Sequence, residues 1–162
     1  MKKDVIVGLG EIGKPIFKIL SKKHLAVGYD TNSKSMNEKI FKKYQSYETS
    51  FLHIAIPVSA KFDSHVISLY KKFRPECITI HSTISPGTTD RLQKKLPIPI
   101  IYSATRGVHK RMLKDLKRYT KFYAISPKAP KKKWASSKFA QIMKKCGIKT
   151  KKMSKPETLE LA

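Results

Sequence analysis

Three glycines and one aspartate near the amino terminus have the residue types and the spacing that could bind a diphosphate and a sugar. Gly8, Gly10 and Gly13 form a G-x-G-x-x-G turn, and Asp30 follows this turn at a distance of roughly 20 residues. Glycine permits a sharp turn and a close approach of backbone amides to phosphate oxygens, and a carboxylate can accept hydrogen bonds from ribose hydroxyls. The pattern predicts a dinucleotide site, and the alternative is a glycine turn that is only structural.

Regular elements on both sides of the turn support this prediction. Residues 5–7 are consecutive β-branched residues, as in a parallel strand that is buried on both faces. A helix after Gly13 would point its N-terminal amides at the phosphates and bury an apolar stripe. That stripe consists of Ile12, Ile16, Ile19 and Leu20. Residues 25–29 are expected to form a second strand that ends on Asp30.

The acidic residue after the second strand also bears on the choice of cofactor. A carboxylate at Asp30 would repel the extra phosphate of NADP, so the sequence favours NAD. Lys34 and the general positive charge keep NADP open as the alternative.

Apolar and β-branched runs predict a Rossmann-type α/β fold, a doubly wound and mainly parallel sheet with helices on both faces. Further strands are expected over residues 51–58, 77–81, 98–102, 120–126 and 149–153, with a short edge strand possible at 44–47. Helices are expected over residues 34–44, 60–73 and 134–146, and from near Thr88. Residues 103–111 are expected to form a basic loop.

Loops that follow parallel strands form the rim where cofactors bind in such sheets. The loop 82–89 is dense in hydroxyls, turns at Pro86-Gly87 and leads into a helix. It could hold a carboxamide, a ribose or a substrate oxyanion. An equal alternative is that the same hydroxyls only cap the helix.

The basic loop at the same rim could bind an anionic substrate. Arg106, His109 and Arg111 supply the charge, and His109 could exchange a proton near neutral pH. The candidate substrate residues are therefore Ser85, Arg106 and His109, with His109 as the candidate catalytic residue. The alternative is an exposed basic loop without a catalytic role.

The chain of 162 residues suits one domain, and its formal net charge of +24 would attract polyanions. Non-specific nucleic-acid binding at low salt is one interpretation, and Trp134 beside the lysines of 131–133 could stack on a base. The alternative is a solvated, lysine-rich surface with Trp134 in the core.

Several other features point to a cytoplasmic protein without a membrane partner or a metal. No apolar run approaches the length of a bilayer span, and the N-terminal apolar segment is too short for a secretion signal. Cys77 and Cys146 lack motif spacing and are expected to be reduced, packed thiols. His53 lies in an apolar run and is expected to be a hydrogen-bonded core residue rather than a metal ligand.

The motifs of residues 4–102 resemble the N-terminal NAD-binding domain of the UDP-glucose/GDP-mannose dehydrogenase family, within the wider group of 6-phosphogluconate-dehydrogenase-like oxidoreductases. The segments GLGEIGKP, GYD, IPV and HSTISPGTTDRL match its glycine turn, its second-strand end, its third-strand loop and its STxxPGTT segment. The resemblance implies that the pyrophosphate and adenosine are lined by Gly8, Gly10, Glu11, Ile12, Gly13 and Asp30. It implies that Pro57, Val58 and Thr83 lie near the rest of the NAD. Thr31 and Ser82 complete the predicted cofactor-binding set.

The chain also departs from that family. Residues 103–112, SATRGVHKRM, contain no carboxylate where the family has a glutamate, and Cys77 and Cys146 do not match the family's catalytic cysteine. The family's catalytic cysteine and lysine lie in a central helix and a C-terminal domain outside these residues.

These features together predict how the chain is organised and what it does. Residues 1–153 are expected to form the dinucleotide-binding domain, and residues 154–162 to begin a helix that leads to a second domain. The expected function is the NAD-binding part of an oxidoreductase that acts on an alcohol carbon. A second domain or a homo-oligomeric partner would supply the part that binds and oxidises the substrate. The alternative is a non-catalytic NAD-sensing or nucleic-acid-associated module.

Overall fold

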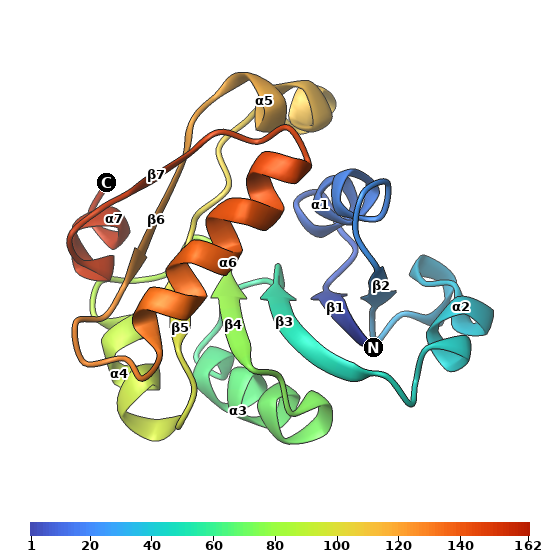
Figure 1. Ribbon diagram of the computed structural model, residues 1–162, viewed down its shortest axis with the longest axis horizontal. Coiled ribbons are helices and arrows are strands. Elements are labelled where there is room, and N and C mark those ends of the chain that lie inside the picture. Colours follow the sequence, from blue (N-terminus) through green and yellow to red (C-terminus); the bar gives the residue numbers. More distant parts are fainter.

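A seven-stranded sheet forms the centre of the molecule in the computed structural model, which describes residues 1–162 apart from the side chain of His109 (Figure 1). The strand order is β2-β1-β3-β4-β5-β6-β7, and all neighbours are parallel except β5 and β6. The strands are β1 Lys2–Val7, β2 Ala26–Tyr29, β3 Glu48–Ile54, β4 Cys77–Ile80, β5 Ile100–Tyr102, β6 Lys121–Ile125 and β7 Thr150–Lys152. The predicted fold, doubly wound and mainly parallel, is confirmed.

Helices cover both faces of this sheet and enclose two apolar cores. The α-helices are α1 Gly13–Leu20, α2 Glu38–Lys43, α3 Phe62–Phe73, α4 Thr88–Lys95, α5 Met112–Arg118, α6 Lys132–Lys145 and α7 Pro156–Glu160. Short 3₁₀ turns cover Ser33–Ser35 and His109–Arg111. Helices α1, α5 and α6 pack on one face, and α3 and α4 pack on the other (Figure 1). None of the helices in the described part of the chain is long and apolar enough to cross a membrane.

The strands are buried on both faces because their apolar side chains alternate between the two cores. In β1, Val5 and Val7 join the core under α3 and α4, whereas Ile6 joins the core under α1 and α6. Helix α1 buries Ile16, Ile19 and Leu20 of the predicted stripe, while Ile12 is only partly buried. The hydrophobic pattern therefore placed the main elements correctly.

Two expectations for the region after β2 were wrong. The edge strand at 44–47 is a turn, because the Tyr44 amide donates to Ile40 O at 3.3 Å and the Tyr47 amide donates to Tyr44 O at 3.1 Å. The helix over 34–44 is shorter than expected, because the Asn37 side chain accepts from the Ile40 amide at 3.2 Å and caps α2 there. Strand β2 is therefore the edge of the sheet on this side.

Helix α5 lies just after the basic loop, in a segment for which the sequence pattern predicts no element. Its buried apolar residues Met112 and Leu116 are four residues apart. The apolar periodicity that could have predicted this helix therefore extends over only one helical turn. Asp115 Oδ2 accepts from the Val108 amide at 2.8 Å and fixes the preceding turn. The ring centroids of Trp134 and Phe51 lie 5.8 Å apart, but Trp134 is 37% exposed. Trp134 therefore lies at the margin of the core.

A buried polar cluster joins three strands inside this apolar sheet. The β1–β3 register shifts beside Asp4, and Asp4 Oδ1 accepts from the Phe51 amide at 3.2 Å. Asp4 Oδ2 lies 3.2 Å from Nε2 of both His53 and His24, and His53 Nδ1 lies 2.9 Å from His81 Nε2. His53 is thus a hydrogen-bonded core histidine, as predicted. The two cysteines are free and buried, which also agrees with the prediction.

The Asp4 carboxylate is the charged centre of this cluster. Burial alone would raise the pKa of Asp4, but hydrogen bonds from His24 and His53 outweigh burial and lower this pKa below its ordinary value. A folded-state pKa below the unfolded value means that Asp4 contributes stability at neutral pH, which is lost as the pH falls through the folded-state pKa.

We expect Asp4→Ala to lower the free energy of unfolding at pH 7 by about 3 kcal/mol, because it leaves the buried His53 imidazole and the Phe51 amide without their acceptor. Urea denaturation measures this change. The control is Asp63→Ala, which removes an exposed ion pair with Arg91 and should cost below about 1 kcal/mol. Equal losses in the two variants would contradict the role given to Asp4.

Candidate functional site

The site begins where the strand order reverses direction. The chain passes from β1 to β2 on one side and later returns to β3 on the other side of β1. In parallel sheets, the loops at such a point diverge and leave a crevice at the carboxyl ends of the strands. Gly8 follows β1 at this position, and residues 55–57 follow β3.

The three glycines of the turn have different roles. Gly8 has φ of +89°, and a Cβ there would lie 2.5 Å from the Ala55 carbonyl oxygen. A Cβ on Gly13 would lie 1.6 Å from the Gly8 carbonyl oxygen, so these two glycines are required by close packing. A Cβ on Gly10 would meet nothing within 4 Å, which leaves open space beside the first turn of α1. Amides of a first helical turn lack helical partners, so this space suits an anionic group such as a diphosphate.

The Asp30 carboxylate is held in place at the end of β2. Its Oδ2 accepts from the Leu9 amide at 2.8 Å, and its Oδ1 accepts from the Asn32 amide at 2.9 Å. These two bonds connect the glycine turn to the end of β2 and leave further lone pairs on both oxygens. A fixed carboxylate beside the glycine turn can accept hydrogen bonds from a ribose.

A cavity of about 450 Å³, which we call the Asp30 groove, opens between these two loops. It is lined by Val7, Gly8, Tyr29, Asp30, Thr31, Ile56, Pro57, Ser59, His65, Ser68 and Leu69. The structure thus brings together Gly8, Asp30, Thr31 and Pro57 of the predicted set. Val58 is 45% exposed and is not among the residues that line the groove.

The remaining predicted residues of the glycine turn lie beside the groove. Glu11 is exposed in the turn, and Ile12 occupies the N-cap position of α1. Gly10 and Glu11 line a shallower hollow with Leu9 and Lys14. The turn therefore presents its backbone along the start of α1, next to the groove.

The hydroxyls of the 82–89 loop have three different surroundings, and only one of them matches the helix-capping role that the sequence allowed. Ser82 is buried, and its Oγ donates to the Ile56 carbonyl oxygen at 2.6 Å, so it ties this loop to the loop after β3. The Thr88 hydroxyl donates to the Ser85 carbonyl oxygen at 2.7 Å and closes the turn before α4. Thr83, in contrast, is exposed and lines a second cavity.

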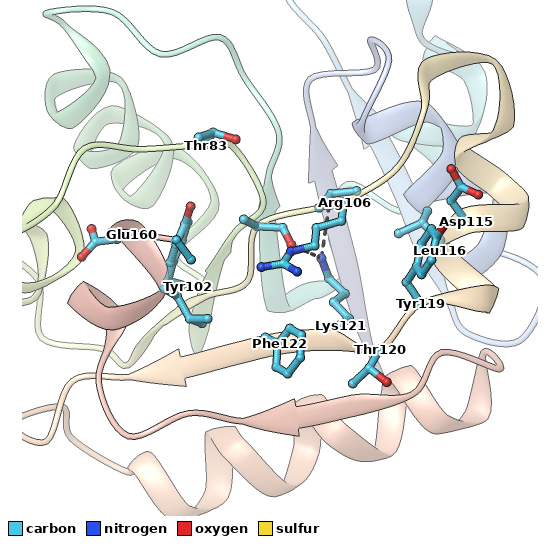
Figure 2. A pocket seen from close by; sticks show the side chains of 14 residues that line it. Thr83, Tyr102, Arg106, Asp115, Leu116, Tyr119, Thr120, Lys121, Phe122 and Glu160 are labelled. Carbon is cyan, nitrogen blue, oxygen red and sulfur yellow. Dashed lines mark hydrogen bonds between the residues drawn. The ribbon is translucent and has the colours of Figure 1, made fainter.

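This second cavity of about 150 Å³, the Lys121 pocket, lies between the carboxyl end of β5, the start of β6 and α7 (Figure 2). Its lining residues are Thr83, Tyr102, Ala104, Thr105, Arg106, Asp115, Leu116, Tyr119, Thr120, Lys121, Phe122, Leu159, Glu160 and Ala162. Arg106 lies over the Phe122 ring with its Cζ 5.4 Å from the ring centroid. The side chain of His109, the candidate catalytic residue, lies outside the part of the molecule that the structure describes.

Two ionisable residues of this pocket were not identified from the sequence. Burial lowers the pKa of Lys121 to about 7, and the only available signal was a lysine inside the apolar run 120–126. Burial also raises the pKa of Glu160, although the amides of Gly87 and Thr89 donate to its carboxylate at 3.3 and 3.2 Å. Glu160 comes from α7, which packs against α4 and β6.

Solved structures with this fold include several dehydrogenases. The UDP-D-ManNAc dehydrogenase from Pyrococcus horikoshii matches 99% of this chain and 49% of its own, with a TM-score of 0.72 and 15% identity. The UDP-N-acetyl-mannosamine dehydrogenase from S. aureus matches 99% of this chain and 48% of its own, with a TM-score of 0.69 and 18% identity. Prephenate dehydrogenase from A. aeolicus, in complex with hydroxyphenyl propionate and NAD⁺, matches 99% of this chain and 62% of its own, with a TM-score of 0.70 and 21% identity.

These similarities establish the Rossmann-type fold. Two of the three structures are UDP-sugar dehydrogenases, which agrees with the resemblance drawn from the motifs. The chain spans about half the length of those two proteins. No protein-family model and no curated protein sequence matches the chain.

The glycine geometry gives a test of the turn that needs no ligand. We expect Gly13→Ala to lower the free energy of unfolding by about 3 kcal/mol, because the new Cβ would collide with backbone. Gly10→Ala should change this free energy by less than about 0.5 kcal/mol, because its Cβ meets open space. Chemical denaturation of both variants measures the difference. A Gly10→Ala variant as unstable as Gly13→Ala would contradict the described turn.

Proposed function

We propose that this chain binds NAD and forms the dinucleotide-binding part of an oxidoreductase that acts on an alcohol carbon. The observation that carries the proposal is the Asp30 carboxylate, fixed by the Leu9 amide beside a glycine turn with open space at Gly10. The fold supports the proposal, since it is shared with dehydrogenases, one of which contains NAD⁺.

The residues of the Asp30 groove fit the parts of a dinucleotide. Backbone amides at the start of α1 would face the diphosphate, and Asp30 would accept from the hydroxyls of one ribose. Ile56, Pro57 and Leu69 give the groove apolar walls for an adenine ring. The Asp30 charge favours NAD over NADP, whose additional phosphate it would repel. The nicotinamide, when bound, supplies the hydride acceptor.

The substrate half of the reaction needs groups beyond the Asp30 groove. We propose that residues 1–153 form the dinucleotide-binding unit and that residues 154–162 lead to a further domain, or that a second copy of the chain supplies the missing surface. The length of the UDP-sugar dehydrogenases, about twice that of this chain, supports the first arrangement. Light scattering of the purified protein would distinguish a monomer from a homo-oligomer.

We expect NADH fluorescence to change on titration with the protein, and Asp30→Ala to weaken NADH binding at least about tenfold by removing a charged acceptor. NADPH should bind the unmodified protein more weakly than NADH. Gly10→Ala should also reduce NADH affinity, because its methyl group would occupy the space assigned to the diphosphate.

The matched control is Asp63→Ala, which removes an equal charge from a side chain that is paired with Arg91 and does not line the groove. It should leave NADH affinity unchanged. Circular dichroism of the Asp30→Ala variant separates a lost ligand contact from a lost fold. Unchanged NADH fluorescence on mixing with the folded, unmodified protein would refute the proposed function.

A second candidate function rests on charge alone. The net charge of +24 supports a non-catalytic module that associates with nucleic acid, and NAD sensing would be a further role of its glycine turn. If so, anisotropy of a labelled DNA duplex should report binding whose affinity falls about 10³-fold or more between 50 and 200 mM salt. No binding at 50 mM salt would exclude the nucleic-acid interpretation.

A further inference from the structure

Lys121 is a buried lysine whose amine has only neutral hydrogen-bond partners. Its side chain belongs to a residue that is 6% exposed, and its Nζ donates to Ser103 O at 2.8 Å, Ala104 O at 3.4 Å and Thr105 Oγ1 at 3.1 Å. None of the ion pairs found among the described side chains includes Lys121. A buried ammonium without a counter-charge is costly, and the group responds by favouring its neutral form.

The antiparallel direction of β6 places this amine at the rim formed by the carboxyl ends of the parallel strands. Tyr102 at the end of β5 pairs with Ala124, so the residues before Ala124 extend beyond the carboxyl end of β5. Lys121 therefore lies beside residues 103–105, at the rim where the loops after β1, β3 and β4 also lie. A parallel β6 would have put Lys121 at the opposite edge, away from this rim.

The Lys121 pocket surrounds the amine with polar and ionisable side chains of both charge types. Figure 2 shows the Lys121 amine near the centre of the pocket, with Arg106 beside it and Thr83 on the far wall. The other ionisable groups that line the pocket are Asp115, Tyr119 and Glu160 together with Tyr102. Burial is the main cause of the lowered pKa of His81, and the positive charge of Lys121 is the next largest cause.

We propose that Lys121 is the acid–base group of this pocket and exchanges a proton, through the Thr105 hydroxyl, with a small anionic compound that carries an alcohol or a carbonyl. This inference rests on the proposed function. Arg106 would hold the negative charge of that compound, and the apolar Phe122 ring beneath the guanidinium keeps Arg106 at the pocket.

The proton and electron balance follows from the contacts. The alcohol O–H bond breaks, its proton passes to Thr105 Oγ1, and the proton of the Thr105 hydroxyl passes to the neutral amine of Lys121. The amine accepts this proton along the 3.1 Å contact in which its charged form donates to Thr105 Oγ1. A bound dinucleotide would supply the acceptor for the hydride that leaves the alcohol carbon, which accounts for the electron pair. The reverse sequence reduces a carbonyl and returns the proton from the ammonium. A burial-lowered pKa of about 7 suits exchange in both directions.

The first test measures the titration of Lys121 without any ligand. Lysine labelled with ¹³C at Cε, observed by NMR from pH 5.5 to 10.5, should show one signal that titrates within about one unit of pH 7. Lys121→Arg should remove this signal, while the exposed-residue control Lys128→Arg should retain it. If no lysine signal titrates below about pH 9, the proposal is wrong. A lysine that only fixed the loop as an ammonium would give that result.

The second test asks whether the neutral amine faces a small anionic carbonyl compound. Glyoxylate with sodium cyanoborohydride at pH 7 condenses with a neutral amine, and reduction of the imine leaves a stable carboxymethyl group that peptide mass mapping locates. At this pH about half of Lys121 is neutral, against roughly 1 in 2,500 of a lysine with a pKa of about 10.4.

We therefore expect Lys121 to react at least about tenfold faster than the exposed lysines. Both tests omit dinucleotide, so their failure is separate from a failure of NADH to bind, which would refute the proposed function instead.

Discussion

The close approach of α1 to the end of β1 is the constraint on which the rest of the site depends. A Cβ on Gly13 would lie 1.6 Å from the Gly8 carbonyl oxygen, so only a glycine pair lets the helix start at this distance from the sheet. This contact aims the first turn of α1 along the crevice between β1 and β3. It also brings the Leu9 amide within 2.8 Å of Asp30, which fixes the carboxylate at the groove wall. The same contact therefore fixes the direction of the α1 dipole and the position of the Asp30 carboxylate.

A second constraint is the polar cluster within the sheet. Asp4 accepts from the Phe51 amide where the β1–β3 register shifts, and His53 extends the cluster to His81 at the end of β4. Strands β1, β3 and β4, whose carboxyl ends border the crevice and the rim, are thereby joined by side chains as well as by their backbones. The pairing is consistent with an apolar sheet because each buried charge or ring nitrogen of Asp4 and His53 has a partner.

Prediction from the sequence succeeded where local chemistry decides the structure. Residues 5–30 contain their own strand, glycine turn, helix and acidic end, so periodicity and residue type were sufficient. It failed at 44–47, where backbone turns after α2 replace an edge strand, and at α5, whose single apolar pair is too short a signal. For the hydroxyl loop, only the contacts of Ser82 and Thr88 separated helix-capping and loop-tying roles from the exposed position of Thr83.

The sequence by itself determined the α/β class, the two buried faces of the sheet and the glycine–aspartate pairing, because each depends on residues close together in the chain. Only the tertiary structure decided the direction of β6 and hence the place of Lys121. Strand direction depends on which edge the connecting segment crosses, and no local pattern of apolar residues records it. The hydrogen-bond partners that enclose the Lys121 amine come from the loop after β5. They precede Lys121 in the sequence by 16 to 18 residues.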